Sequence, residues 1–215
     1  MMAALFAREL RRSWASGAIW LPIAFFLLVA TLYPFAVGPD AATLARTGGG
    51  MAWVAALLSA LLPVDRLVAP DHDAGVLDQL AVRGFADESI AAVKIAAHMA
   101  GFGVPLLVAL LPASALLGLS GATLQQLATG LAIACPALAS LAVMTAALTA
   151  NLRGGGSIGG LVLLPLSVPV LIFGAGMLNP VGAGGGALKL LVASALLLTA
   201  IGPFAAGAAL RALRE

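Results

Sequence analysis

The chain has little charge, and this scarcity excludes most soluble folds. Asp, Glu, Lys and Arg make up only 9% of its 215 residues, whereas 62% are hydrophobic and the mean hydropathy is +1.09. A soluble domain carries roughly 25% charged residues, which keep its surface in contact with water. With so few charges, the chain is expected to have a lipid bilayer as its solvent.

Cysteine and catalytic motifs are equally scarce. Cys135 is the only cysteine, so the chain can form neither an intrachain disulfide nor a thiolate metal cluster. The net charge is only +2, and no basic patch alternates with aromatic residues, which argues against nucleic acid as a partner. Three Gly-Gly-Gly triplets occur, but none leads into the Lys-Ser or Lys-Thr of a phosphate-binding loop. The chain therefore encodes no ATP site, and we expect no enzymatic activity of its own.

Long uncharged runs predict the membrane spans. A spanning helix needs about 20 mostly apolar residues. The longest run, Ile95–Leu152, has room for two such helices joined by a turn at Gly118–Gln126. We therefore predict an all-α integral membrane protein with one domain, residues 1–215, and six spans at about 17–37, 47–66, 91–117, 126–150, 157–178 and 187–210.

The basic residues predict the orientation of these spans. An even number of spans places both termini on one side of the membrane, and nine basic residues would lie on that side: Arg8, Arg11, Arg12, Arg66, Arg83, Lys94, Arg153, Arg211 and Arg214. Only Arg46 and Lys189 would lie on the other side. Because Lys and Arg favour the cytoplasmic side, both termini are expected in the cytoplasm.

Nine of the charged side chains lie in one segment, Val64–Lys94. Burying nine charges in a bilayer would cost more than about 20 kcal/mol. We therefore place a loop, residues 67–90, at the cytoplasmic surface between the second and third spans. Asp71 and Asp73 are expected to stabilise the start of a short helix in this loop, since carboxylates favour helix N-termini.

This short helix is predicted to be amphipathic, and two interpretations of it remain open. One face would carry Val76, Leu77, Leu80 and Ala81, and the opposite face Asp78 and Gln79. Gly84 would end the helix, and Asp87 and Glu88 would begin the third span. The helix could rest on lipid headgroups, although such helices usually carry Lys and Arg on their polar face. Alternatively, it docks into a groove of a cytoplasmic partner.

No charged residue is predicted deep within a span, as an ion-driven carrier would require. His98 lies four residues after Lys94 on the same helix face. We interpret it as a satisfied or interfacial histidine, with a ligand or relay role as the alternative. Pro165 and Pro169 are expected to kink the fifth span, and all three tryptophans, at positions 14, 20 and 53, to anchor spans at the membrane interface.

Spans without energy-coupling residues and a charged cytoplasmic loop are typical of the permease subunit of an ABC-type transporter. Asp65 and Arg66 precede the loop, and "KIAAH" follows it. The loop itself carries Asp73, Gly75, Leu77 and Asp78, and later come "GVPLL", "LRGGG", "LPLSVPVLIFGA" and "GPFAAGAALR". In this order and spacing, these residues resemble the cytochrome c maturation protein B family over nearly the whole length.

The resemblance implies a subunit of an ATP-driven complex in the bacterial inner membrane. The complex would export haem or drive release of the haem-loaded periplasmic chaperone, protein E. ATP would bind to the separate ATPase, protein A, and membrane proteins C and D would be further partners. Haem would be cargo, with His98 as the one candidate contact. The interface with the ATPase would be formed by Asp65, Arg66, Asp71, Asp73, Gly75, Leu77, Asp78 and Leu80. An export permease for another substrate and a non-transporting assembly scaffold remain alternatives.

Overall fold

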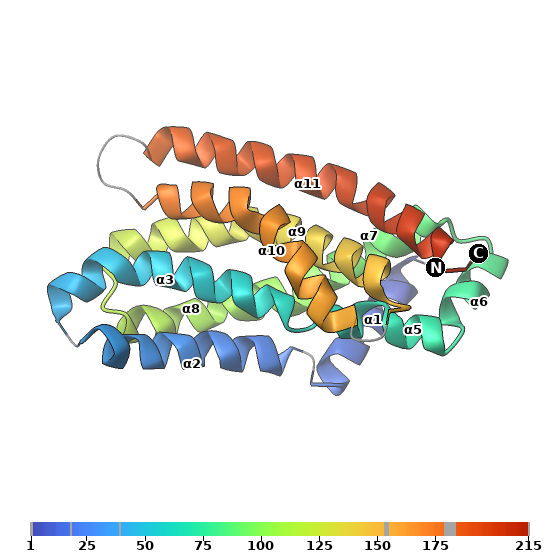
Figure 1. Cartoon of the computed structure of the whole chain (residues 1–215), viewed down its shortest axis with the longest axis horizontal. Coiled ribbons are helices and arrows are strands. Elements are labelled where there is room, and N and C mark those ends of the chain that lie inside the picture. Colours follow the sequence, from blue (N-terminus) through green and yellow to red (C-terminus); the bar gives the residue numbers. More distant parts are fainter. Residues whose placement is uncertain (1, 18, 39, 153–154, 179–183, 215) are drawn as a thin grey trace.

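The computed structural model of the chain describes residues 2–17, 19–38, 40–152, 155–178 and 184–214. Within these residues every regular element is a helix, which confirms the all-α prediction (Figure 1). The elements are α1 (Met2–Ala15), α2 (Trp20–Val37), α3 (Ala41–Leu61), α4 (Val64–Leu67), α5 (Ala69–Asp73), α6 (Val76–Val82), α7 (Asp87–His98), the π-helix η1 (Met99–Gly103), α8 (Val104–Leu116), α9 (Gly121–Thr149), α10 (Gly155–Gly176) and α11 (Gly184–Ala212).

The long helices form a bundle, and the short helices gather at one of its ends. Figure 1 shows α1, α5 and α6 at the end of the bundle where both ends of the chain also lie. The centre of the bundle is α9, which packs against α3, α4, α7, α8, α10 and α11. Leu131, Leu138 and Val143 of α9 are fully buried for this reason.

The described residues contain four helical stretches that are long and apolar enough to cross a membrane. These are Trp20–Val37, Asp87–Leu116, Gly121–Thr149 and Gly185–Ala212. A fifth is reached if α3 and the helices after it, which meet at an angle of 42°, count as one broken span. The structure thus shows a protein with four or five candidate spans, and the count of six stays a prediction.

Two predicted spans begin earlier than expected because polar residues cap their helices. The second span was expected from residue 47, but α3 begins at Ala41, since the Asp40 carboxylate accepts a hydrogen bond from the Thr43 backbone N–H at 2.7 Å. Hydrogen bonds from Thr43 lower the pKa of Asp40. Likewise α9 begins at Gly121 and not at residue 126, because Ser120 accepts from the Thr123 N–H at 3.2 Å.

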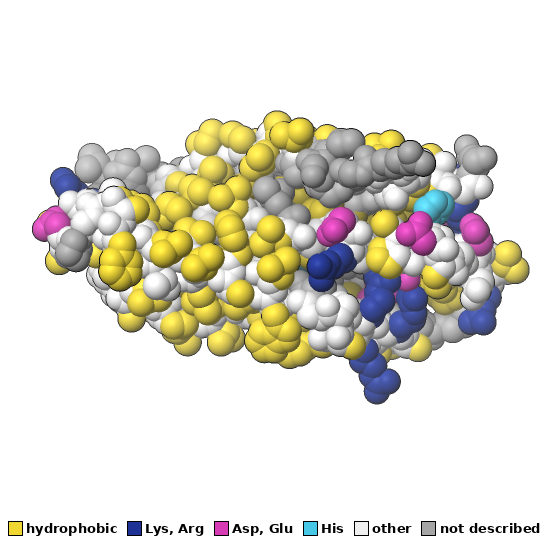
Figure 2. Space-filling view, turned by 60° about the horizontal axis from the view of Figure 1, so that its bottom comes forward, with side chains coloured by type: hydrophobic (Ala, Val, Ile, Leu, Met, Phe, Trp, Pro, Cys, Tyr) yellow, Lys and Arg dark blue, Asp and Glu magenta, His cyan; other side chains and the backbone are white. Residues whose placement is uncertain are grey.

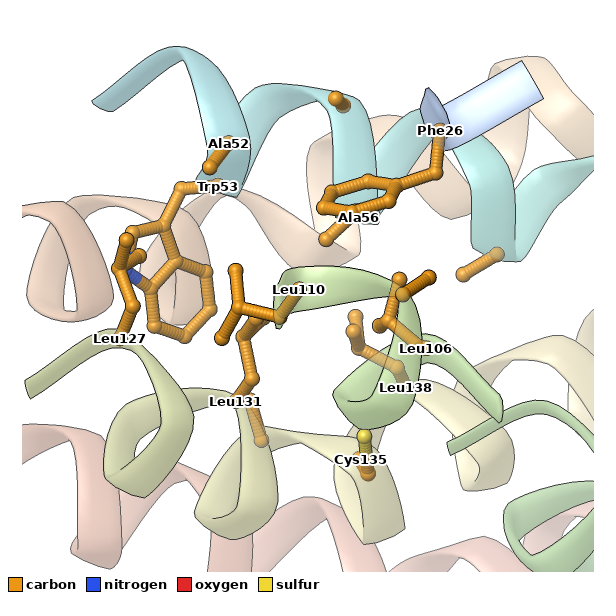
Figure 3. Close-up of a cluster of buried hydrophobic side chains, with 14 of the residues drawn as sticks. Phe26, Ala52, Trp53, Ala56, Leu106, Leu110, Leu127, Leu131, Cys135 and Leu138 are labelled. Carbon is orange, nitrogen blue, oxygen red and sulfur yellow. The ribbon is translucent and has the colours of Figure 1, made fainter. Parts of the chain in front are cut away.

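Trp53 lies in the core and is only 1% exposed. The prediction that it anchors a span at the membrane interface is therefore wrong. Figure 3 shows its indole reaching from α3 towards Leu127 and Leu131 of α9. The ring has this room because its neighbours include glycines: a Cβ at Gly174 would lie 2.5 Å from the indole. Trp14 and Trp20 are 50% and 60% exposed, as an interfacial position requires.

Candidate functional site

Charged side chains gather at the end of the bundle that holds α5 and α6. Figure 2 shows Lys, Arg, Asp and Glu side chains concentrated over that half of the visible face, while the rest is largely hydrophobic. Part of the predicted cytoplasmic side, Arg153 and the start of "RGGG", lies outside the described residues. The described charged residues at this end form a buried cluster and a second set of ion pairs, and others are exposed on or beside the short helices.

Five side chains form the buried cluster, which we call the ionic cluster: Arg8, Glu9, Arg12, Asp71 and Lys94. The Lys94 ammonium donates to Asp71, to Glu9 Oε2 at 3.2 Å and to the Leu67 carbonyl at 3.0 Å. The other Asp71 oxygen accepts from Arg8 Nη2 at 2.8 Å and from Arg12 Nη1 at 2.7 Å. The cluster therefore joins α1, α5 and α7.

Lys94 and the two carboxylates are almost fully withdrawn from water. The side chains of Asp71, Lys94 and Glu9 are 2%, 3% and 6% exposed. Buried charges are tolerated only when each is paired, and removing one partner of a buried pair costs roughly 3–5 kcal/mol. The third predicted span thus has a buried charge near its start, Lys94, which the sequence placed on the cytoplasmic side of the membrane.

The contribution of α1 was missed by sequence reasoning, which assigned no helix before residue 17. Leu5, Glu9 and Arg12 recur at spacings of four and three, the signature of one helix face, and the first two are buried in the structure. This spacing could have revealed the helix. It could not have revealed the partner of Glu9, because Lys94 lies 85 residues further along the chain.

Asp71 was expected to stabilise the start of the loop helix, and this expectation is wrong. The residue before α6 is Gly75, with φ of +66°, and no side chain caps the helix. Asp71 instead ends up against three cations from α1 and α7, which bind a carboxylate more strongly than free N–H groups do. Asp73 is exposed.

The amphipathic helix itself is present as α6, with the predicted division of its faces. Leu77 is 2% exposed and packs in a core cluster with Val64, Val68 and Ile90. Asp78 and Gln79 are exposed, and Leu80 is half-buried against the same cluster. The Leu77 side chain is therefore packed against the protein's own helices and is not free to enter a groove of a partner, whereas Leu80 stays partly accessible.

Several charged side chains remain accessible near α6. Asp65 and Arg66 on α4, together with Asp73, Asp78 and Arg83, are exposed. Val82 at the end of α6 is 89% exposed. Gly84, with φ of +81°, follows the helix as predicted. A partner at this end would thus meet charged side chains together with the exposed Val82 and the half-buried Leu80 and Phe85.

A second set of ion pairs ties α7 to α11. Asp87 accepts from Arg214 at 2.6 Å and from Arg211 at 3.4 Å, and Glu88 accepts from Arg211 at 2.8 Å. Asp87 and Glu88 begin α7, as predicted. Gly207 of α11 lets the helices approach closely, since a Cβ there would lie 2.8 Å from the Glu88 backbone nitrogen.

His98 lies at the end of α7 and is 6% exposed. Its ring stacks on Phe102, with the centroids 5.6 Å apart, and no partner for its Nε2 exists among the described residues. It lines a cavity of about 20 Å³ with Arg12 and Arg66, which is room for about one water molecule. A contact with haem would require the surrounding helices to separate.

The two prolines of the predicted fifth span lie inside α10. The side chains of Pro165 and Pro169 are exposed, and the helix continues past both residues. Proline removes a backbone donor wherever it occurs in a helix. The backbone of α10 therefore lacks a hydrogen-bond donor at each of these positions. That the helix bends there stays a prediction.

Comparison with known proteins gives a consistent result. The family model described as CcmB protein matches residues 1–213. The heme exporter protein B of Paracoccus denitrificans is 44% identical over 214 residues, covering 98% of both chains. Those of Rhodobacter capsulatus and Escherichia coli K12 are 41% and 36% identical, and each match covers at least 96% of both chains.

These matches extend over almost the whole chain, and they confirm the family predicted from its motifs. Together with the long apolar helices, they identify a multi-pass protein of the bacterial inner membrane. The chain belongs to the CcmB protein family.

Proposed function

We propose that this chain is the membrane permease subunit of an ATP-driven haem exporter whose ATPase is a separate protein. The relatives' name, heme exporter protein B, supports haem as the cargo. The ATPase would bind at the end that carries α4, α5 and α6, since that end exposes most of the charged side chains. Both termini would lie in the cytoplasm, and the six long helical segments would each span the membrane.

The observation that carries this proposal is the connection between the exposed loop and a spanning helix. Asp71 of α5 is ion-paired to Lys94 of α7. The helical stretch that contains Lys94 continues through η1 and α8 as one of the candidate spans, Asp87–Leu116. A movement of the loop driven by nucleotide binding would therefore displace this span as a rigid element.

The same connection extends to two further helices. Glu9 and Arg12 bring α1 into the ionic cluster, and Asp87 and Arg211 link α7 to α11. A displacement of α7 would thus be shared with α1 and α11. This sharing suits a subunit that converts the movement of a bound ATPase into a rearrangement of its whole bundle.

The test is to separate ATPase binding from haem delivery. The chain is co-expressed with the ATPase, protein A, with membrane proteins C and D and with the haem chaperone, protein E. Lys94→Met is expected to retain the ATPase, because the exposed surface is unchanged, and to lower haem-loaded chaperone by at least tenfold. Lys189→Met, on the exposed first turns of α11, is the matched control and should behave as wild type.

Full haem delivery by the Lys94→Met protein would contradict the mechanical role of the cluster. Haem transport and chaperone release are distinguished by a second measurement. Proteoliposomes containing the complex either accumulate haem in an ATP-dependent way without the chaperone, or release haem-loaded chaperone only when it is added. Neither activity would be expected of an assembly scaffold. An exporter of another substrate would give no ATP-dependent accumulation of haem in the proteoliposomes.

A further inference from the structure

A groove lies between α1 and the segment around α6, and Arg8 belongs both to its lining and to the ionic cluster. Its volume is about 520 Å³. We call it the α1–α6 groove, and it is lined by Ala4, Leu5, Arg8, Leu80, Arg83 and Phe85. The function proposed above uses the ionic cluster but leaves this groove unexplained.

The groove combines an apolar floor with basic side chains. Leu5 is buried, and Leu80 and Phe85 are half-buried, so the floor is formed by apolar surface that the chain does not cover completely. Arg83 is exposed, and the Arg8 side chain is 40% exposed. None of the lining residues is acidic.

The charge of the ionic cluster makes Arg8 available to a further carboxylate. The cluster holds three cations, Arg8, Arg12 and Lys94, against two carboxylates, and so carries one positive charge in excess. Arg8 is the most exposed of the three, at 40% against 29% for Arg12 and 3% for Lys94. A guanidinium has five donors, so Arg8 can bind Glu9 and Asp71 on one side and a carboxylate in the groove on the other.

We propose that the α1–α6 groove is the binding site for a segment of the ATPase subunit that presents an apolar side chain flanked by carboxylates. This inference rests on the function proposed above and specifies where the partner binds. The apolar anchor would lie on Leu80 and Phe85, and the carboxylates would pair with Arg8 and Arg83. Recognition would thus use basic residues of this chain, whereas the sequence predicted that the apolar face of the loop helix, flanked by acidic residues, enters a groove of the partner.

An anionic lipid headgroup is the competing occupant, and the surroundings disfavour it. The exposed aromatic pair Trp14 and Trp20, with centroids 6.0 Å apart, lies at the opposite end of α1, and tryptophan prefers the membrane interface. The groove is therefore located at the end of α1 remote from these anchors.

The test measures ATPase binding to the purified chain in nanodiscs, one set of neutral phosphatidylcholine and one containing anionic phosphatidylglycerol. Arg83→Glu is expected to weaken binding at least tenfold in both. Arg11→Glu makes the same charge change on an exposed arginine of α1 that does not line the groove, and it should change binding less than twofold.

A second pair of variants adds side-chain volume without changing charge, one inside the groove and one outside it. Ala4→Trp places an indole in the groove and should also weaken binding at least tenfold, whereas Ala3→Trp, at an exposed residue of α1 that does not line the groove, should not. If both Arg83→Glu and Ala4→Trp bind the ATPase with wild-type affinity, the groove is not its binding site, and the proposed function is unaffected. Weakening confined to the anionic nanodiscs would assign the groove to lipid, and failure of the wild-type chain to bind the ATPase would overturn the proposed function as well.

Discussion

At the scale of single residues, the charge balance of the ionic cluster decides which substitution does most damage. Without Lys94, the two remaining arginines still neutralise Glu9 and Asp71. Without the charge of Asp71, three cations share the single carboxylate of Glu9. Two uncompensated positive charges in a site of low polarity are more costly than a balanced set.

We therefore expect Asp71→Asn to destabilise the protein by about 3–5 kcal/mol and Lys94→Met to destabilise it clearly less. For a chain of this length, each kcal/mol lowers the melting temperature by roughly 2–4 °C. Thermal unfolding in detergent, followed by helical circular dichroism, measures both variants. An equal loss in the two would mean that the charge balance does not govern the cluster.

At the scale of elements, α6 is a short helix that is stabilised by the core cluster on which it packs. Its seven residues are too few to be stable alone. Leu77 binds it to the core cluster of Val64, Val68 and Ile90, and Leu80 and Phe85 pack against the same cluster. The helix is thus an extension of the bundle, held in place by the packing of its buried face.

Leu77→Asp is accordingly expected to destabilise this end of the protein by about 4 kcal/mol, because it buries an unpaired carboxylate. Val82→Asp makes the same chemical change on the same helix at a side chain that is 89% exposed, and it should be nearly neutral. Limited proteolysis of residues 67–90 in membranes compares the two. Rapid cleavage of the Val82→Asp protein, or resistance of the Leu77→Asp protein, would contradict this packing.

At the scale of the whole molecule, charge is divided between the two ends of the bundle. Asp78 lies on α6 at the end with the short helices, whereas Lys189 lies in the first turns of α11 at the opposite end. Nine basic residues against two favour the cytoplasm for the first end. This division agrees with the proposed topology, which places both chain termini in the cytoplasm.

Cysteine labelling tests this topology directly, because Cys135 is the only cysteine and is buried. In a Cys135→Ala background, a membrane-impermeant maleimide should label Lys189→Cys in intact spheroplasts and Asp78→Cys only in inverted vesicles. Labelling of Asp78→Cys from outside intact cells would place the loop in the periplasm, out of reach of any cytoplasmic ATPase.

The sequence by itself determined the helical class, the approximate positions of the apolar helices, the charged loop with its short helix, and the family. These are local properties, because the length of an apolar run and the order of motifs can be read along the chain. Only the tertiary structure decided which groups meet. Lys94 pairs with Glu9 85 residues away, Leu77 turns inward, and Trp53 is buried beside glycines of other helices. Each of these depends on how separate helices pack, and no pattern within one helix specifies its neighbour.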